Sequence, residues 1–126
     1  MMEKFTFEKL DVWQKARVLV KDVYRLSSKF PYDERFGLTN QLNRAVVSVP
    51  SNIAEGCGRP SYKERIHFLE IAYGSLMEAM TQIILASDLN YITIEELNQI
   101  RAKIIEIAKM INGLRKNLLT KIATLH

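Results

Sequence analysis

The apolar residues in the last third of the chain recur at alternating steps of three and four, and this spacing constrains the fold most strongly. It continues without a break from Leu97 to Leu118. Such steps place side chains on one face of an α-helix, and a seven-residue repeat makes a seam that packs against other helices. The series is Leu97, Ile100, Ile104, Ile107, Ile111, Leu114 and Leu118. We therefore predict a long amphipathic helix that lies against other helices.

Two earlier stretches carry the same spacing. Between Val12 and Phe30, and again between Leu38 and Ile53, apolar residues recur every three or four positions. The first set is Val12, Ala16, Leu19, Val23, Leu26 and Phe30, and the second is Leu38, Leu42, Ala45, Val46, Val49 and Ile53. Each set occupies one face of a helix, which predicts two more amphipathic helices.

Turn residues mark the ends of these two helices. Pro31 ends the first, because it forces Phe30 out of helical geometry, and Asp33 is expected to cap the start of the second. Gly56 and Gly58 are expected to end the second helix, since glycine accepts the left-handed conformation that is common at helix C-termini.

Two capping boxes mark the starts of the remaining helices. Ser61 and Thr93 are each followed three residues later by a glutamate, Glu64 and Glu96. We therefore expect four helices, over approximately residues 9–29, 34–56, 61–88 and 93–123. The 126 residues suit one domain, and no alternating stretch rich in Val, Ile and Thr predicts a strand. The predicted fold is all-α, an antiparallel up-down four-helix bundle over residues 1–126.

The stretch "VVSVPSNIAEGCGRPS" places Pro50 inside the second helix. Proline lacks the N–H that would bond to the carbonyl of Val46, so the helix is predicted to be kinked there. Ser48, Ser51 and Asn52 are expected to satisfy the freed backbone groups through side-chain hydrogen bonds. We interpret this stretch as a structural device that favours assembly, rather than as an active site.

The third helix is apolar on two sides. One face consists of Phe68, Ala72, Leu76, Ala79 and Ile83, and the other of Ile66, Tyr73, Met77 and Ile84. Two explanations fit this pattern. Either the helix is surrounded within its own bundle, or the second face is an interface for self-association.

Known catalytic and metal-binding patterns do not fit this chain. The stretch "EGCGRPS" lacks the lysine and the preceding strand of a phosphate-binding loop. Cys57 is the single cysteine, and no histidine and acid accompany it as a nucleophile requires. Glu64 and His67 form one Glu-x-x-His unit, whereas a di-iron bundle needs two. We therefore predict neither enzyme activity nor a metal or cofactor.

The charge pattern suggests an anionic partner. The formal net charge is +4 and the pI is about 9.3. The predicted first helix carries a basic row at steps of four, away from the core face, formed by Arg17, Lys21, Arg25 and Lys29. Trp13 and Tyr24 border this row, where they can stack on bases of a single strand or pack inside the bundle. Ordinary solvated helix faces are the alternative explanation for such a charge excess.

Composition also bears on location. Apolar residues make up 48% and charged residues 25%, as in globular chains, and no apolar run is long enough to span a membrane. The segment "MMEKFTFEKL" lacks the apolar stretch of a signal peptide, and one cysteine cannot form an intrachain disulfide. We expect a cytoplasmic protein without a membrane partner.

Three stretches together resemble the four-helix-bundle family named for ribosomal 23S rRNA intervening sequences. They are "FEKLDVWQKA" from Phe7, "FGLTNQLNRAVVSVPSNIAEG" from Phe36 and "FLEIAYGSLMEA" from Phe68. The likeness covers nearly the whole chain in the family's order. It implies a small cytoplasmic bundle of the kind encoded in inserts within bacterial ribosomal RNA genes, which assembles as a homopentamer. A related branch of accessory factors binds nucleic acid and a reverse transcriptase of diversity-generating retroelements.

The resemblance also implies a set of structural and assembly positions. These are Gly37, Leu38, Gln41, Arg44, Ser48, Pro50, Asn52, Ile53, Ala54, Glu55 and Gly56, with Gly74, Ser75 and Glu78 on the third helix. One position departs from the family's pattern, because Asn43 stands where members often have the first of two arginines. This loss of a charge weakens the patch around Arg44 as a phosphate site.

Two functions follow as hypotheses. The first is a non-enzymatic oligomer, the pentamer that the resemblance implies, which binds RNA or DNA backbones. The binding residues would be Arg17, Lys21, Arg25, Lys29 and Arg44, and a reverse transcriptase or ribonucleoprotein would be a further partner. The second is an oligomeric scaffold or protein-interaction module without nucleic-acid affinity. In both, Ile66, Tyr73, Met77 and Ile84 are the candidate interface residues.

Overall fold

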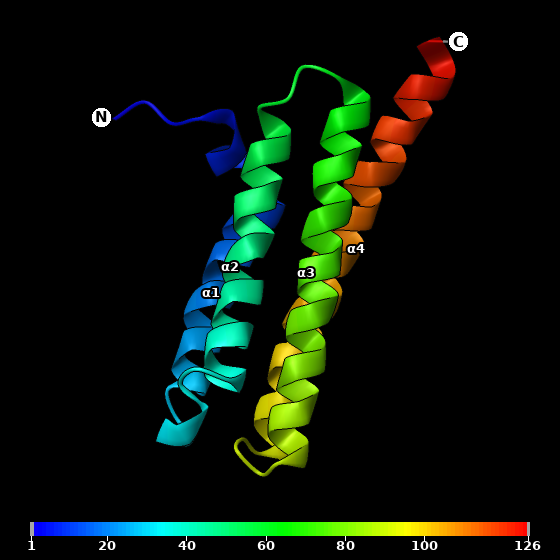
Figure 1. Ribbon diagram of the computed structural model, residues 1–126. Coiled ribbons are helices and arrows are strands. Elements are labelled where there is room, and N and C mark those ends of the chain that lie inside the picture. The colour runs from blue at the N-terminus through cyan, green and yellow to red at the C-terminus, as the bar shows by residue number, and fades with distance from the viewer. Residues whose placement is uncertain (1, 126) are drawn as a thin grey trace.

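Four long helices form the computed structural model, which describes residues 2–125. In chain order they are α1 (Asp11–Ser27), α2 (Leu38–Cys57), α3 (Tyr62–Asp88) and α4 (Ile94–Leu125), and two short 3₁₀ turns, η1 (Thr6–Lys9) and η2 (Tyr32–Glu34), precede α1 and α2. Consecutive helices run in alternating directions (Figure 1). The all-α prediction is confirmed, and no strand occurs among the described residues.

The predicted apolar faces of α1, α2 and α4 form the core. Every residue of these three predicted faces is buried except Leu38, Leu114 and Leu118. Leu38, Leu114 and Leu118 are only partly buried, because they lie near the ends of the bundle. Each helix packs against two neighbours: α1 against α2 and α4, and α3 also against α2 and α4.

The predicted starts of α3 and α4 are confirmed. The Ser61 hydroxyl accepts a hydrogen bond from the backbone N–H of Glu64 at 3.1 Å. At α4, the backbone N–H of Glu96 donates to the Thr93 hydroxyl at 3.1 Å, and the Glu96 carboxylate accepts from the Thr93 N–H at 3.0 Å. These bonds satisfy N–H groups that have no partner within the first turn.

The predicted start of α2 is wrong. Asp33 lies in η2, and α2 begins at Leu38, whose N–H donates to the Glu34 carboxylate at 3.3 Å. Glu34 also accepts a hydrogen bond from the Tyr91 hydroxyl at 2.8 Å, which raises the pKa of Tyr91. One carboxylate thus connects the start of α2 with the α3–α4 connection.

The left-handed conformation predicted for Gly56 and Gly58 is also wrong, because no described glycine has a positive φ. Gly56 is a buried residue inside α2, and an added Cβ would lie 2.9 Å from the Cβ of Phe68 on α3. Glycine is therefore needed at this position for close packing of α2 against α3.

Pro50 lies inside α2, which continues as a helix on both sides of it. The Ser51 hydroxyl donates to the Val47 carbonyl at 2.9 Å, and the Asn52 amide donates to the Ser48 carbonyl at 2.8 Å. The predicted side-chain bonds are present, but they reach the two carbonyls that follow Val46 rather than the one that Pro50 leaves free.

Candidate nucleic-acid interface

The four cations of the basic row do not face one way. Successive members are four residues apart, and a step of four advances the direction around a helix by about 40° because a turn holds 3.6 residues. The row therefore winds from Arg17, on the side of α1 that meets α2, toward α4, where Lys29, two residues beyond the end of α1, pairs with Glu96. All four side chains are exposed.

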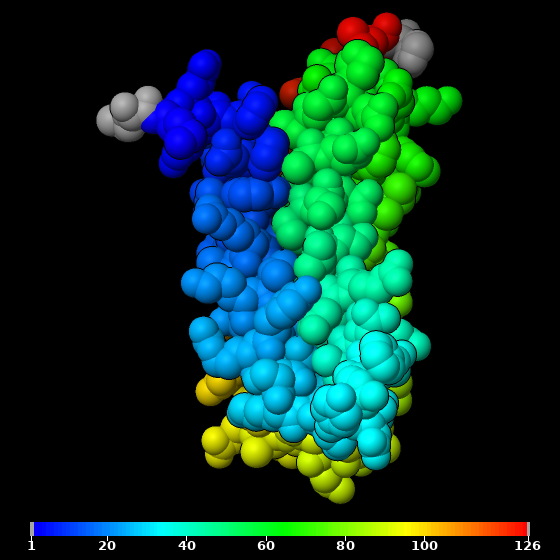
Figure 2. All heavy atoms as spheres, turned by 60° about the vertical axis from the view of Figure 1, so that its left-hand side comes forward, coloured from blue at the N-terminus to red at the C-terminus, as the bar shows by residue number. Residues whose placement is uncertain are grey.

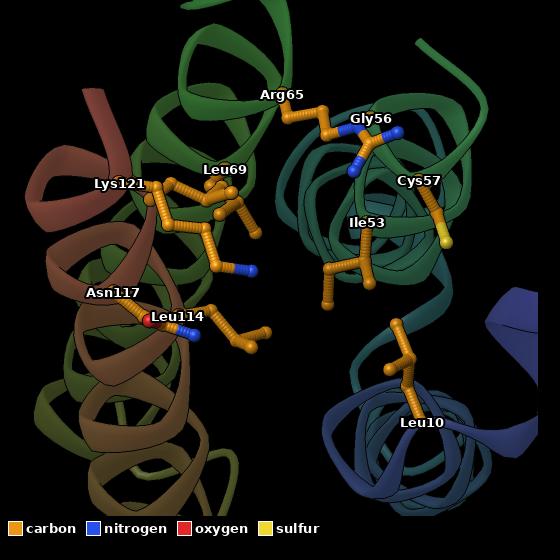
Figure 3. Close-up of a pocket in the computed structure, with 10 residues that line it drawn as sticks. Leu10, Ile53, Gly56, Cys57, Arg65, Leu69, Leu114, Asn117 and Lys121 are labelled. Atoms are coloured by element: carbon orange, nitrogen blue, oxygen red, sulfur yellow. The ribbon is translucent and has the colours of Figure 1, made fainter. Parts of the chain in front are cut away.

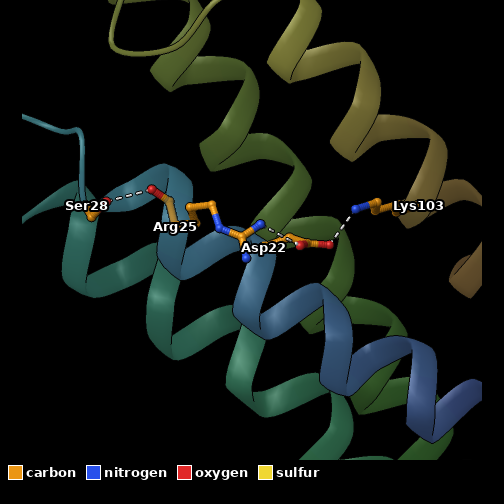
Figure 4. A network of polar contacts seen from close by, with 4 residues as sticks. All are labelled: Asp22, Arg25, Ser28 and Lys103. Carbon is orange, nitrogen blue, oxygen red and sulfur yellow. Dashed lines mark hydrogen bonds and ion pairs between the residues drawn. The ribbon is translucent and has the colours of Figure 1, made fainter.

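The α4 end of the row is engaged in ion pairs. Lys29 pairs with Glu96, and Arg25 lies 3.3 Å from Asp22, which also accepts a bond from Lys103 of α4 at 2.5 Å. Figure 4 shows Asp22 between these two cations. Negative charge at Asp22 and Glu96 lowers the potential around Arg25 and Lys29, so neither is a free anion-binding group.

Two ion pairs with α4 shift the pKa values of Glu96 and Lys15. The hydrogen bond from Lys29, followed by the one from the Thr93 N–H, lowers the pKa of Glu96. Lys15 of α1 pairs with Glu106 of α4 at 2.8 Å, and this hydrogen bond raises the pKa of Lys15. Water screens pairs as exposed as these, so they contribute little to the stability of the fold.

The other end of the row borders a groove between α1 and α2. The α1–α2 groove has a volume of about 460 Å³, and Figure 2 shows the two helices side by side on this face. Its walls are Phe7, Trp13, Arg17, Val20, Lys21, Val47, Pro50, Ser51 and Ala54. The groove therefore joins two members of the basic row to the proline-containing stretch of α2, and no acidic residue lines it.

Aromatic side chains form one end of the α1–α2 groove. Trp13 is half-buried and packs edge-on against Phe7, with ring centres 5.0 Å apart. The guanidinium of Arg17 lies 5.6 Å from the centre of the Trp13 ring, within the range of a cation–π interaction. Trp13 thus packs against the core and also lines the groove, whereas 47% of the surface of Tyr24 is exposed.

Arg44, the fifth candidate cation, is exposed on α2 but lies outside the residues that line the groove. The neighbouring Asn43 accepts a hydrogen bond from the buried Ser27 hydroxyl of α1 at 2.8 Å. Asn43 therefore joins α1 to α2.

The four candidate interface residues lie within the chain's own bundle. Ile66 is buried, with 8% of its surface exposed, and Tyr73, Met77 and Ile84 are partly buried and pack against the core. The prediction that α3 exposes this face is wrong for Ile66. Because α3 packs against both α2 and α4, its two apolar sides have partners inside the monomer. The more exposed apolar side chains of α3 are Ile71 and Leu85, at 38% and 46%.

Several of the positions singled out from the sequence join α2 to α3. The hydroxyl oxygens of Ser48 and Ser75 lie 2.9 Å apart, and the Asn52 amide donates to the Ser48 hydroxyl at 2.8 Å. Gly74, the residue before Ser75, is exposed and has open space where a Cβ would lie. Spacing alone did not indicate the contact between the two serines, because spacing within one helix does not show which residue of the next helix it meets.

Glu64 and His67, which were considered as metal ligands, have structural roles. Glu64 lies in the first turn of α3, where its backbone N–H donates to the capping Ser61 hydroxyl, and the exposed His67 ring packs edge-on against Phe68 with centres 5.4 Å apart. Within residues 2–125, no three His, Cys, Asp or Glu side chains gather as metal ligands do. No helix of that part of the chain is long and apolar enough to cross a membrane.

Comparison with known proteins identifies the family and the fold of the chain. The model of the family described as 23S rRNA-intervening sequence protein matches residues 8–113. The chain belongs to this family. A crystal structure of a protein of unknown function from the S23 ribosomal protein family of Bacteroides thetaiotaomicron is similar, with a TM-score of 0.77 and 24% identity. That match covers 83% of this chain and 98% of the other, and it shows the shared fold. No curated protein matches the chain.

Family membership confirms the resemblance seen in the sequence. The match ends at residue 113, whereas α4 continues to Leu125. In Figure 1 the last turns of α4 reach past the α2–α3 connection. Three C-terminal turns of the chain therefore lie outside the part that the family model describes.

Proposed function

We propose that this member of the 23S rRNA-intervening sequence protein family is a non-enzymatic oligomer that binds nucleic-acid backbones in the α1–α2 groove. The observation that carries the proposal is the composition of this groove. Arg17 and Lys21 line it without an acidic neighbour among its walls, and Trp13 lies beside Arg17. Cations beside an aromatic ring are the recurrent elements of single-strand binding surfaces.

The geometry of the two cations suits a sugar-phosphate backbone. Arg17 and Lys21 are four residues apart, so they are separated by about 6 Å along the helix axis. At this spacing two cations can contact neighbouring phosphates of one strand. Contacts of this type release counterions and carry no base specificity, so the proposed binding is salt-dependent and tolerant of sequence.

We also propose that the protein assembles as a homo-oligomer, and specifically as the homopentamer that the family resemblance implies. Apolar side chains remain exposed on the outer faces of three helices, including Val18 at 51%, Ile71 at 38% and Ile105 at 46%. Only about half or less of each side chain is still exposed, so burying the remainder contributes roughly 0.6–1.5 kcal/mol for each, and several together can support a subunit interface. Repetition of the groove around a ring makes binding multivalent. The partner that we propose for such an assembly is a ribonucleoprotein or a reverse transcriptase in a bacterial cytoplasm.

A scaffold without nucleic-acid affinity is the second candidate function. It is favoured by the ion pairs of Arg25 and Lys29, which leave only half of the basic row available. In this alternative the exposed apolar side chains bind another protein, and the cations keep the assembly soluble.

Electrophoretic mobility shifts with RNA and with DNA, at low and at physiological salt, distinguish the two functions. We expect the wild-type protein to shift both at low salt and to bind less at physiological salt. Arg17→Glu with Lys21→Glu should abolish the shift, because both charges of the α1–α2 groove are reversed. Lys109→Glu with Lys116→Glu is the matched control, since it makes the same charge change on exposed positions of α4.

Two results would support the scaffold instead. One is a wild-type protein that shifts neither nucleic acid at low salt. The other is equal binding by the groove variant and the α4 variant. Circular dichroism and light scattering on both variants check that the fold and the oligomer mass are unchanged.

A further inference from the structure

A second cavity lies at the end of the bundle where the C-terminal turns of α4 stand opposite the end of α2. This end cavity has a volume of about 160 Å³ and lies between α2, α3 and α4, with Leu10 at the start of α1 as a further wall (Figure 3). Its body is apolar, formed by Ile53, Leu69, Leu114 and Leu118. Leu114 and Leu118 are only partly buried, so the apolar core is not closed at this end.

The end cavity depends on the part of α4 that the family model does not describe. Leu114, Asn117, Leu118 and Lys121 line it, and all four come after residue 113. Without these turns, Ile53 and Leu69 would lie at an open end of the bundle. The cavity is therefore a feature of this chain rather than of the matched family region.

Polar groups at the cavity are cationic or neutral. Arg65 donates its Nε–H to the Arg59 carbonyl at 2.7 Å, and its guanidinium lies 5.8 Å from the centre of the Tyr62 ring. The Lys121 ammonium lies 5.7 Å from the centre of the same ring. Within residues 2–125 neither cation has a carboxylate partner within 4.0 Å. In Figure 3 the side chains of Lys121 and Asn117 extend from α4 toward the space between the helices.

We infer that the end cavity binds a small monocarboxylate with an apolar body of about six carbons. A dry cavity of about 150 Å³ lined by aliphatic side chains holds one benzene molecule, so this cavity suits a body of that size. The carboxylate then lies at the mouth, where Lys121, Arg65 and the Asn117 amide supply donors. Cations without a carboxylate partner make an anion at this mouth favourable, which distinguishes the ligand from a neutral hydrocarbon.

Hexanoate is the probe that tests this inference, and Cys57 provides the first readout. This partly buried thiol lines the cavity and is the single cysteine of the chain. Hexanoate should slow the alkylation of Cys57 by iodoacetamide, which is neutral and does not respond to the nearby charges. Hexanol at the same concentration should protect less, and acetate, which lacks the apolar body, should not protect.

Calorimetric titration with hexanoate provides the second readout. Lys121→Gln should weaken the affinity by about fivefold, the effect of losing one partly solvated ion pair. Lys116→Gln is the matched control, because it removes the same charge from an exposed position of the same helix. Leu118→Trp should abolish hexanoate binding by filling the apolar body of the cavity.

Three outcomes of the binding measurements would overturn the inference. They are no protection of Cys57 by hexanoate, equal protection by hexanol and hexanoate, and equal loss of affinity in Lys121→Gln and Lys116→Gln. A thiol that is unreactive in the assembled protein but reactive after dissociation would also overturn it, because a second copy would then occupy the cavity. No nucleic acid is used, so the outcome is independent of the proposed function.

Discussion

Replacement of Gly56 by alanine tests the closest contact that we have described between α2 and α3. A Cβ at this position would lie 2.9 Å from the Cβ of Phe68 and 3.4 Å from the carbonyl oxygen of Arg65. Neither atom is the end of a flexible side chain, so one of the helices must move to accommodate the methyl group. Overpacking of this kind costs about 1–3 kcal/mol.

The intrinsic effect of the substitution has the opposite sign. Alanine is preferred over glycine inside a helix by about 1 kcal/mol. For Gly56→Ala the overpacking cost exceeds this gain, and we expect a net loss of about 1 kcal/mol in the free energy of unfolding. Gly113→Ala is the control, because position 113 lies inside α4 with open space around it. That variant should be about 1 kcal/mol more stable than the wild type.

Urea unfolding followed by far-UV circular dichroism, at one protein concentration, measures both values. The reasoning predicts that the two alanine variants differ from the wild type in opposite directions, and from each other by about 2 kcal/mol. Phe68→Ala should not rescue Gly56→Ala, since alanine retains the Cβ that causes the clash. Equal stabilisation by Gly56→Ala and Gly113→Ala would show that α2 and α3 are not in close contact there.

Three further predictions concern other positions. A Cβ added at Gly74 would meet nothing within 4 Å outside its own helix, so Gly74→Ala should stabilise the isolated chain. A lower oligomer mass by light scattering would place Gly74 at a subunit interface, and a destabilised monomer would contradict the structure. The pKa of Glu96 is lowered in the folded state, so its ionised form stabilises the fold above the ordinary value of 4.5, and this contribution is lost as the pH falls through the folded-state pKa. Urea unfolding should therefore show Glu96→Gln to be less stable than the wild type at neutral pH, with a smaller difference in acid; a difference that does not change with pH would refute this. Pro50→Ala should keep the helical circular dichroism but straighten α2 and weaken assembly or thermal stability, whereas an unchanged crystal structure and oligomer mass would show that Pro50 has no structural role.

Local physical rules were sufficient for much of the fold. The three-and-four spacing predicted the buried faces of α1, α2 and α4, because burial on one side of a helix repeats with the helical turn. The capping boxes at Ser61 and Thr93 were predictable for a similar reason, since each involves residues three apart. Asp33 was misjudged because a longer side chain, that of Glu34, reaches the N–H of Leu38 from η2.

Features that join distant segments could not be predicted in this way. The basic row was correctly placed off the core face, but its division depends on which side of α1 meets α2 and which meets α4. Likewise, the second apolar side of α3 matched either a neighbouring helix or another subunit, and only the structure shows that Tyr73 and Met77 pack against the core. The α1–α2 groove combines Lys21 with Pro50, and no spacing within either helix indicates that they lie together.

The salt dependence of nucleic-acid binding tests the central claim most directly. Fluorescence anisotropy with a labelled single strand gives the slope of log affinity against log salt concentration, which measures the number of phosphates neutralised. Arg17→Gln with Lys21→Gln should reduce the magnitude of this slope by about 1.4 for each bound subunit, since each lost phosphate contact contributes about 0.7 on a single strand. Arg25→Gln with Lys29→Gln should leave the slope unchanged, because these cations already pair with Asp22 and Glu96. Equal slopes for the wild type and the Arg17 and Lys21 variant, or a larger effect at Arg25 and Lys29, would contradict a binding site in the α1–α2 groove.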